Sequence, residues 1–319
     1  MVEQLQASVI IPTYNRARCL FLCLKALAVQ TVDNTAFEIV VVDNNSRDDT
    51  QDTVLKFAQS HPGLRIRYVC EKKQGASHAR NRGVAEACGE VLCFLDDDAP
   101  PSPGWLGALL EGVADPTVGC VGGPAMLDYR GQERPPWLLG ELQGLLSGYK
   151  LPYTEPTSLS SVEEFPFGCN MAFRRGVFAD LGPFRTDLDR VGGEVLAAGD
   201  TDMIGRVKKA GWKVLYLPNA IVRHLVAPER LKKSHIYRIG RGLAASHVIL
   251  TSDPRPYMVV RWFASDLRYA IHMFLKLVVA IVRQKPLWFD DYMRFWVVAQ
   301  RIPMRARMLL KRGTCGGLT

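Results

Sequence analysis

The chain has 319 residues, of which 48% are hydrophobic and 23% charged, and it shows no internal repeat or low-complexity run. This length suits one large domain or a domain with an appendage, and the composition excludes low-complexity proteins and small disulfide-built scaffolds. The net charge of +8 is unevenly distributed: residues 228–319 contain 17 Lys or Arg and 5 Asp or Glu, whereas residues 1–227 contain 23 and 27. The sequence therefore predicts a mildly acidic domain followed by a basic segment that attracts phosphate groups.

The first hundred residues alternate short apolar runs with helical patterns. Apolar, largely β-branched runs predict buried strands, and the apolar spacing between them predicts helices. Such alternation is typical of βαβ units, so we expect an α/β fold with a mostly parallel, Rossmann-like sheet flanked by helices. The expected strands are 8–11, stopped by Pro12, then 38–42, 65–69 and 91–95, and the expected helices are 20–28, 52–60 and 76–87.

Polar residues follow three of these strands. They are Thr13 to Asn15, Asp43 to Asn45, and the three aspartates Asp96 to Asp98. Ligands of open parallel sheets bind beyond the carboxyl ends of the strands, so we expect these clusters to meet at one crevice.

The second half of the domain begins with a less regular stretch. Residues 130–165 are rich in Pro, Gly and Ser and predict a loop-heavy insertion, with a mobile lid as one interpretation. Regular structure is expected again in the strand FPFGCNMAFRR, the helix GDTDMIGRVKKAG and the strand WKVLYLP.

Two acidic clusters suit catalysis. Crowded carboxylates at Asp96 to Asp98 repel unless a cation or solvent screens them, and Mg²⁺ or Mn²⁺ prefer oxygen ligands and bridge to phosphates. The alternative is a solvated acidic loop. Asp200 and Asp202 open a helix, so Asp200 is either an N-cap residue or a general base that deprotonates an attacking hydroxyl. His224 and Asp43 carry no claim alone, because a lone histidine is often structural and Asp43 suits an Asx turn.

These pieces together resemble glycosyltransferase family 2, an inverting family with the GT-A fold. The resemblance covers about Ala7 to His224 and rests on SVIIPTYNRARCL, EIVVVDNNSRDDT, QGASHARNRGVAEACGEVLCFLDDD, FGCNMAFRR and GDTDMIGRVKKAGWKVLYLPNAIVRH. It implies a catalytic domain over 1–227, with a nucleotide-sugar-binding half to about residue 125 and an acceptor-binding half over about 126–227.

The resemblance also implies roles for individual residues. Asp98 is the main metal ligand, with His224 touching metal or phosphate, and Asp200 is the catalytic base. The family usually has Glu where Gly199 stands, which leaves Asp202 as an alternative base, although the spacing to Arg206 favours Asp200. The residues implied in binding the donor or acceptor are Pro12, Thr13, Tyr14, Asn15, Arg16, Asp43, Arg80, Asp96, Asp97 and Asp202.

Residues 228–319 lie outside the resemblance and predict basic, partly amphipathic helices. Four charges, at Arg261, Asp266, Arg268 and Lys276, interrupt the most apolar stretch. They disfavour a helix that crosses a bilayer but suit helices in the headgroup region. The two interpretations are peripheral contact with the inner face of the cell membrane and packing on the catalytic domain. Scattered cysteines without zinc spacing, and no signal-peptide pattern at the start, predict a cytoplasmic location.

The expected activity is transfer of a sugar from a nucleotide-diphosphate donor, with UDP-sugars favoured, to a hydroxyl of a saccharide or lipid-linked acceptor. A divalent cation, Mg²⁺ or Mn²⁺, is the expected cofactor, and the expected role is polysaccharide, cell-envelope glycan or glycolipid biosynthesis. The alternatives are a nucleotidyltransferase and a non-catalytic nucleotide- or nucleic-acid-binding protein. Nucleic acid is not expected as a partner, because the basic segment has no recognisable binding motif.

Overall fold

The structure, a computed structural model, describes residues 5–161, 164–188, 198–252, 255–285 and 288–313. The chain divides into two compact units. Unit 1 comprises Met1–Gly131, Ser147–Asp189 and Gly199–Val226. Unit 2 comprises Gln132–Leu146, Arg190–Ala198 and Ala227–Thr319, so it takes in part of the loop-rich insertion as well as the basic C-terminal segment.

Unit 1 is built on an eight-stranded sheet with the order β3-β2-β1-β4-β8-β5-β9-β7. Strands β3, β2, β1 and β4 are mutually parallel, β8 runs antiparallel to both β4 and β5, and β7 runs antiparallel to β9. A second, parallel pair joins β6 to β10. The strands are β1 Ala7–Thr13, β2 Phe37–Asp43, β3 Arg65–Cys70, β4 Val91–Leu95, β5 Val118–Gly122, β6 Ala125–Asp128, β7 Thr157–Ser158, β8 Asn170–Arg174, β9 Lys213–Tyr216 and β10 Val222–Leu225.

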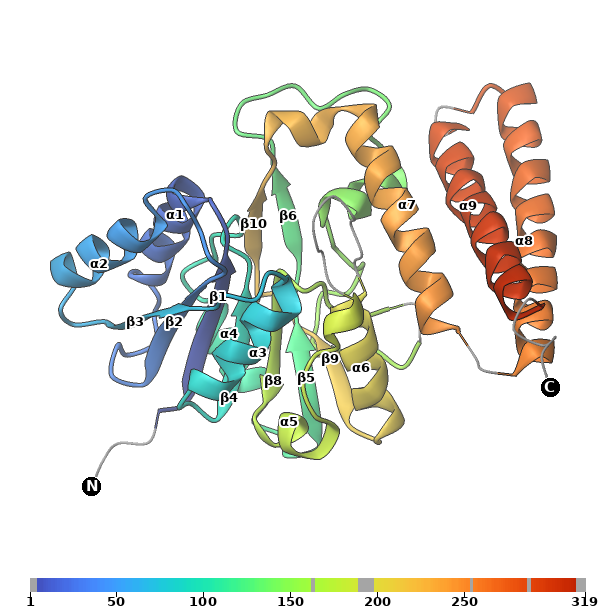
Figure 1. Ribbon diagram of the computed structural model, residues 1–319. Helices are drawn as coiled ribbons and strands as arrows, with labels where there is room; N and C mark the ends of the chain where they lie inside the picture. The colour runs from blue at the N-terminus through green and yellow to red at the C-terminus, as the bar shows by residue number, and fades with distance from the viewer. Residues whose placement is uncertain (1–4, 162–163, 189–197, 253–254, 286–287, 314–319) are drawn as a thin grey trace. The chain divides into compact units, whose positions relative to one another are not determined.

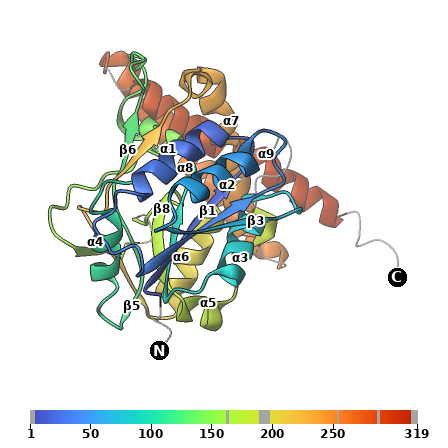
Figure 2. The ribbon, with the colours of Figure 1, turned by 90° about the vertical axis from the view of Figure 1, so that its left-hand side faces the viewer.

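Helices cover both faces of this sheet, as the alternating pattern predicts (Figures 1 and 2). Along β1, Val9 and Ile11 face one apolar core and Ile10 faces the other, because successive side chains of a strand point to opposite faces. The first core is closed by α1 Ala17–Leu27, α2 Thr50–Ser60 and α4 Trp105–Gly112, and the second by α3 Ala76–Glu86, α5 Gly176–Leu181 and α6 Gly199–Lys209. A short 3-10 turn, η2 Thr186–Leu188, precedes α6.

Strand β1 continues through Pro12, which the sequence analysis wrongly took as its end. The Thr13 carbonyl accepts the Asn44 N–H at 2.9 Å, so residue 13 faces β2 and Pro12 faces the opposite side. On that side β4 pairs with β1 only as far as Ile10. The missing N–H of Pro12 therefore interrupts no ladder, which is the condition for proline in a strand.

Buried polar groups join three strands at the amino-terminal edge of the sheet. The Ser8 hydroxyl donates to Glu38 Oε1 at 2.7 Å, and Ser8 Oγ accepts the backbone N–H groups of Cys88 at 3.1 Å and Gly89 at 2.8 Å. Gly89 lies so close to β1 that a Cβ there would be 2.3 Å from the Ala7 carbonyl carbon. This network ties β1, β2 and the start of β4 together at the edge opposite the polar clusters.

Unit 2 is helical in its described part. Its elements are the 3-10 turns η1 Gly140–Leu146 and η3 Pro228–Leu231 and the helices α7 Lys233–Leu250, α8 Pro256–Val282 and α9 Trp288–Gly313. Helices α8 and α9 lie side by side (Figure 1). Between them Arg305 Nε donates to Asp266 Oδ2 at 2.5 Å, and both side chains are almost fully buried. Within the described ranges, no helix has the length and apolar character needed to cross a membrane.

Candidate functional site

The three aspartates after β4 meet the start of α1 at the carboxyl-terminal edge of the sheet. Arg16 donates from one guanidinium nitrogen to Asp97 Oδ1 at 3.1 Å and to Asp98 Oδ2 at 2.7 Å. The Thr13 hydroxyl donates to Asp97 Oδ2 at 2.7 Å. Burial raises the pKa of Asp97 to about 7, although Arg16 and the Thr13 hydrogen bond act in the opposite direction. The structure thus brings Thr13, Arg16 and the acidic trio together, as the sequence analysis expected.

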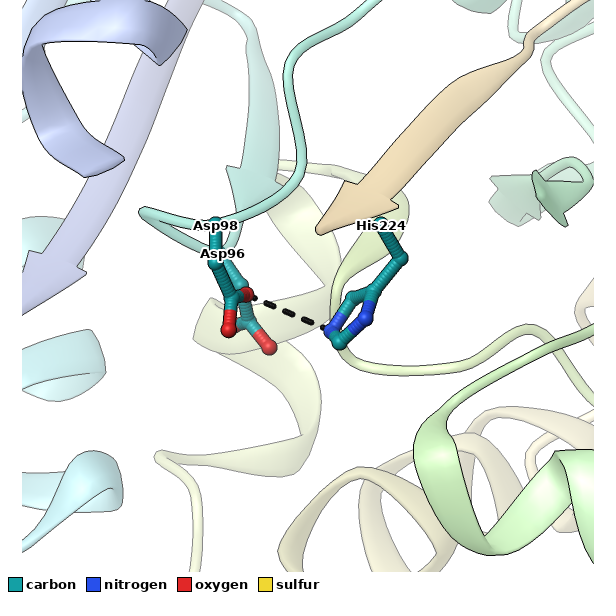
Figure 3. A group of neighbouring side chains, drawn as sticks. All are labelled: Asp96, Asp98 and His224. Atoms are coloured by element: carbon teal, nitrogen blue, oxygen red, sulfur yellow. Dashed lines mark ion pairs between the residues drawn. The ribbon is translucent and has the colours of Figure 1, made fainter. Parts of the chain in front are cut away.

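Asp96, Asp98 and His224 form one cluster (Figure 3). Asp96 and Asp98 follow β4, whereas His224 comes from β10, more than a hundred residues later. One ligand atom from each residue lies within 4.8 Å of the other two, and His224 Nε2 is 3.3 Å from Asp98 Oδ1. Asp98 and His224 are buried and Asp96 is partly exposed, so the cluster opens to solvent on one side.

The chemistry of this cluster fits a divalent cation. Two carboxylates beside an imidazole nitrogen are ligands that Mn²⁺ and related ions accept. His224 is 1% exposed, and its Nδ1 has no hydrogen-bond partner among the described residues. Buried polar atoms normally have a hydrogen-bond partner, so an unpartnered nitrogen on a buried histidine suggests that the side chain serves another purpose, such as binding an ion. Asp96, Asp98 and His224 can therefore hold a metal ion.

The aspartate at the start of α6 reaches the same region through Gly168 and Arg80. The Gly168 N–H donates to Asp200 Oδ2 at 2.9 Å. A Cβ on Gly168 would lie 2.8 Å from Asp200 Oδ2 and 2.9 Å from the terminal nitrogen Nη2 of Arg80. The same nitrogen of Arg80 lies 3.4 Å from Asp96 Oδ1. Asp200, Arg80 and Asp96 therefore border one continuous site.

The thiol of Cys169, next to Gly168, is affected by the carboxylates of both acidic clusters. Burial raises its pKa well above the ordinary value, and Asp96, Asp98 and Asp200 each raise it further. Asp96 and Asp98 follow β4, whereas Asp200 comes from the start of α6.

Asp200 and Asp202 have different surroundings. Besides the Gly168 N–H, Asp200 accepts only the Thr201 N–H, at 2.8 Å from Oδ1, among the hydrogen bonds found in the described chain. Asp202 is bound by Arg206 Nε at 2.8 Å and lies 3.6 Å from an Arg185 nitrogen. Arg206 also donates to two backbone carbonyls, so Asp202 belongs to a structural ion pair within α6. This arrangement favours Asp200 as the carboxylate free to react.

The loops after β1 and β2 lie side by side. Thr13 and Asp43 are register partners at the ends of their strands, which brings Pro12 to Arg16 beside the turn after β2. The Asn15 N–H donates to Ser46 Oγ at 2.8 Å, and Asp43 accepts the Ser46 N–H at 2.9 Å and the Tyr68 hydroxyl at 2.7 Å. The Tyr14 side chain is exposed. Asp43 therefore accepts the N–H three residues on, not two as in the expected Asx turn, and the loop from Pro12 to Arg16 shares this edge.

Sequence reasoning missed Gly168 and Asn170 as residues that shape the site. Asn170 is fully buried, accepts the Trp105 indole N–H at 2.8 Å and donates to the carbonyls of Pro124 and Ala220. It thereby fixes the start of β8 beside the loop that carries Gly168. The signal was the motif FGCNMAF, whose glycine and asparagine were noted only as part of a strand.

Comparison with known proteins gives the family. Residues 8–182 match the family model "Glycosyl transferase family 2", which is more than half of the chain. The chain is 30% identical to glycosyltransferase AglE of Haloferax volcanii over 237 residues, which cover 74% of this chain and 72% of that one. It is 24% identical over 233 residues to the glucosyl-dolichyl phosphate glucuronosyltransferase of the same organism, covering 69% of each chain.

The chain therefore belongs to glycosyl transferase family 2 and is a glycosyltransferase. A solved structure shares the fold: the mannosyltransferase PcManGT of Pyrobaculum calidifontis, in complex with GDP-Man and Mn²⁺, has a TM-score of 0.62 and 22% identity. The similarity covers 93% of this chain and 86% of that one. The GT-A fold expected from the sequence is thus confirmed, and the choice among the three activities falls on glycosyl transfer.

Proposed function

We propose that the protein transfers a sugar from a nucleoside-diphosphate donor to an acceptor hydroxyl in one displacement that inverts the anomeric carbon. The acceptor oxygen forms its bond to this carbon while the bond to the diphosphate oxygen breaks. Asp200 takes the acceptor proton, and the donor leaves as nucleoside diphosphate. One base is sufficient for such a displacement.

The observation that carries this proposal is the continuity of Asp200, Arg80 and Asp96. A base must lie near the reacting carbon, and that carbon is bonded to the diphosphate. Arg80 lies between the base and the acidic cluster, and its buried Nε has no hydrogen-bond partner within the part of the chain that the structure describes. A guanidinium with an unused donor is suited to a diphosphate oxygen.

A divalent cation held by Asp96, Asp98 and His224 would bind the donor diphosphate and neutralise the charge of the leaving group. The imidazole ligand favours Mn²⁺ over Mg²⁺, because Mg²⁺ takes oxygen ligands almost exclusively. Thr13 and Arg16 would orient Asp97 beside the nucleoside, and Asp43 with the loop from Pro12 to Asn15 would bind the base and ribose. A UDP-sugar remains the favoured donor in this proposal.

The acceptor is a saccharide or a lipid-linked sugar in this proposal. Support comes from the relative that is named for glucosyl-dolichyl phosphate, a lipid-linked acceptor. The described cysteines are free thiols, which suits work on the cytoplasmic side of the cell membrane. The corresponding biosynthetic product would be a cell-envelope glycan, polysaccharide or glycolipid.

The test is release of nucleoside diphosphate from a panel of UDP- and GDP-sugars with Mn²⁺, with and without acceptor extracts. Asp200→Asn should lower transfer at least about a thousandfold and leave donor affinity within about twofold, since it removes only the base. Asp202→Asn is the matched control and should retain most transfer activity. If Asp202→Asn abolished transfer and Asp200→Asn did not, the assignment of the base would be wrong.

A further inference from the structure

Helix α8 exposes a row of large apolar side chains. Each of them is 40–54% exposed, and their spacing of three, four or seven residues places them on one face of the helix. The helix spans 27 residues and is therefore about 40 Å long. This apolar stripe consists of Val260, Leu267, Ile271, Phe274, Val278 and Ile281.

A different face of α8 packs within unit 2. Val259, Met273 and Leu277 are 2–6% exposed, and α8 lies along α9. The buried ion pair between Asp266 and Arg305 fixes the rotation of α8 against α9. The helix therefore buries one row of side chains and leaves the apolar stripe exposed, so the stripe does not contribute to the core of unit 2.

The edge beside the first half of the stripe is basic. Arg261 and Arg268 are exposed along it. Residues 255–285 contain six Lys or Arg and one Asp, and that aspartate is the buried partner of Arg305. A partner must therefore combine apolar groups with negative charge. A second copy of this chain fits poorly, because it would bring two basic edges together.

We propose that α8 docks the protein on an anionic lipid bilayer. The helix lies in the plane of the headgroups, with the apolar stripe among the upper acyl carbons and Arg261 and Arg268 at the lipid phosphates. Long basic side chains reach phosphates while their carbon chains stay in the apolar layer. This docking is independent of the proposed chemistry in unit 1, but it would bring the enzyme to lipid-linked acceptors.

The test is cosedimentation of the full chain with vesicles of phosphatidylcholine alone or mixed with phosphatidylglycerol, without donor. Val260→Ser with Leu267→Ser should weaken binding to mixed vesicles at least about tenfold, because two apolar side chains no longer leave water. The matched control is Val29→Ser with Leu55→Ser in unit 1, where valine and leucine are 62% and 44% exposed. This control should bind as the unchanged protein does.

The basic edge is tested separately. Arg261→Gln with Arg268→Gln should weaken binding to mixed vesicles about 25-fold, about fivefold for each charge, and remove most of the preference over phosphatidylcholine. Neither pair of substitutions should change nucleoside diphosphate release or helix content, so loss of folding is detected directly. Conversely, Asp200→Asn should leave vesicle binding unchanged, which separates this proposal from the proposed chemistry.

Two results would overturn the proposal. One is equal sedimentation of the Val260→Ser, Leu267→Ser protein and the unchanged protein with mixed vesicles. The other is a dimer in analytical ultracentrifugation that these two substitutions dissociate, with no vesicle binding by the unchanged protein. The second result would assign the apolar stripe to contact between copies of the chain.

Discussion

Replacing Gly168 by alanine should damage the reaction without unfolding the protein. The new Cβ would lie 2.8 Å from Asp200 Oδ2 and 2.9 Å from the Arg80 terminal nitrogen, where ordinary contact begins at 3.4 Å. The carboxylate must then retreat by about 0.6 Å and Arg80 by a similar distance. Displacement of reacting groups by about 1 Å can cost about 100-fold, so we expect kcat/KM to fall about 10- to 100-fold.

The fold should survive this change. Both atoms in conflict are the ends of flexible side chains, so the free energy of unfolding should fall by only about 1 kcal/mol, the value of one hydrogen bond. Gly205→Ala is the matched control, because Gly205 lies in α6 with Asp200 and its Cβ would meet nothing within 4 Å. Gly205→Ala should keep full activity and gain up to about 1 kcal/mol of stability.

The measurements are nucleoside diphosphate release, donor affinity by calorimetry, and thermal unfolding. An unchanged kcat/KM in Gly168→Ala would refute the reasoning, because it would show that the reaction does not depend on the exact positions of Asp200 and Arg80. A large loss of thermal stability would also contradict it, since the contact would then be structural.

His224→Gln should raise the Mn²⁺ concentration needed for half-maximal activity at least about tenfold, measured by metal titration after chelator treatment. Asp266→Ala should destabilise unit 2 by about 3–5 kcal/mol in urea because Arg305 loses its buried partner, and adding Arg305→Met should recover part of this loss. Burial and then Arg301 lower the pKa of His247 from its ordinary 6.5 to about 4. Between pH 6.5 and pH 4 the unfolded chain is therefore protonated at His247 and the folded chain is not. The free energy of unfolding should fall as the pH drops through this range. His247→Gln should reduce that fall, measured by thermal unfolding at several pH values.

The first half of the fold could be predicted because its strands are buried on both faces. Such strands read as continuous apolar runs, and the predicted strand 91–95 agrees with β4 residue for residue. The same property hid the direction of β8. Its residues are buried on both faces like those of the parallel strands, so the sequence does not reveal that it runs antiparallel between β4 and β5.

The site was predictable where a side chain carries the chemistry. Asp96, Asp98 and Asp200 stood out as carboxylates at the ends of elements, and the structure brings them together. Gly168 could not be singled out, because its contribution is a backbone N–H and the absence of a side chain. The pairing of Asp202 with Arg206 does follow from helical spacing, since residues four apart share one face.

The network of Ser8, Glu38 and Gly89 has a consequence for how this enzyme can diverge. It holds three strands at one edge of the sheet, while the carboxylates lie at the other. Changes in the loops at the carboxylate edge leave that anchor untouched. Substitutions in those loops can therefore change which sugar or acceptor is bound without altering the register of the strands. A side chain at Gly89, by contrast, would disturb the sheet whatever the substrate.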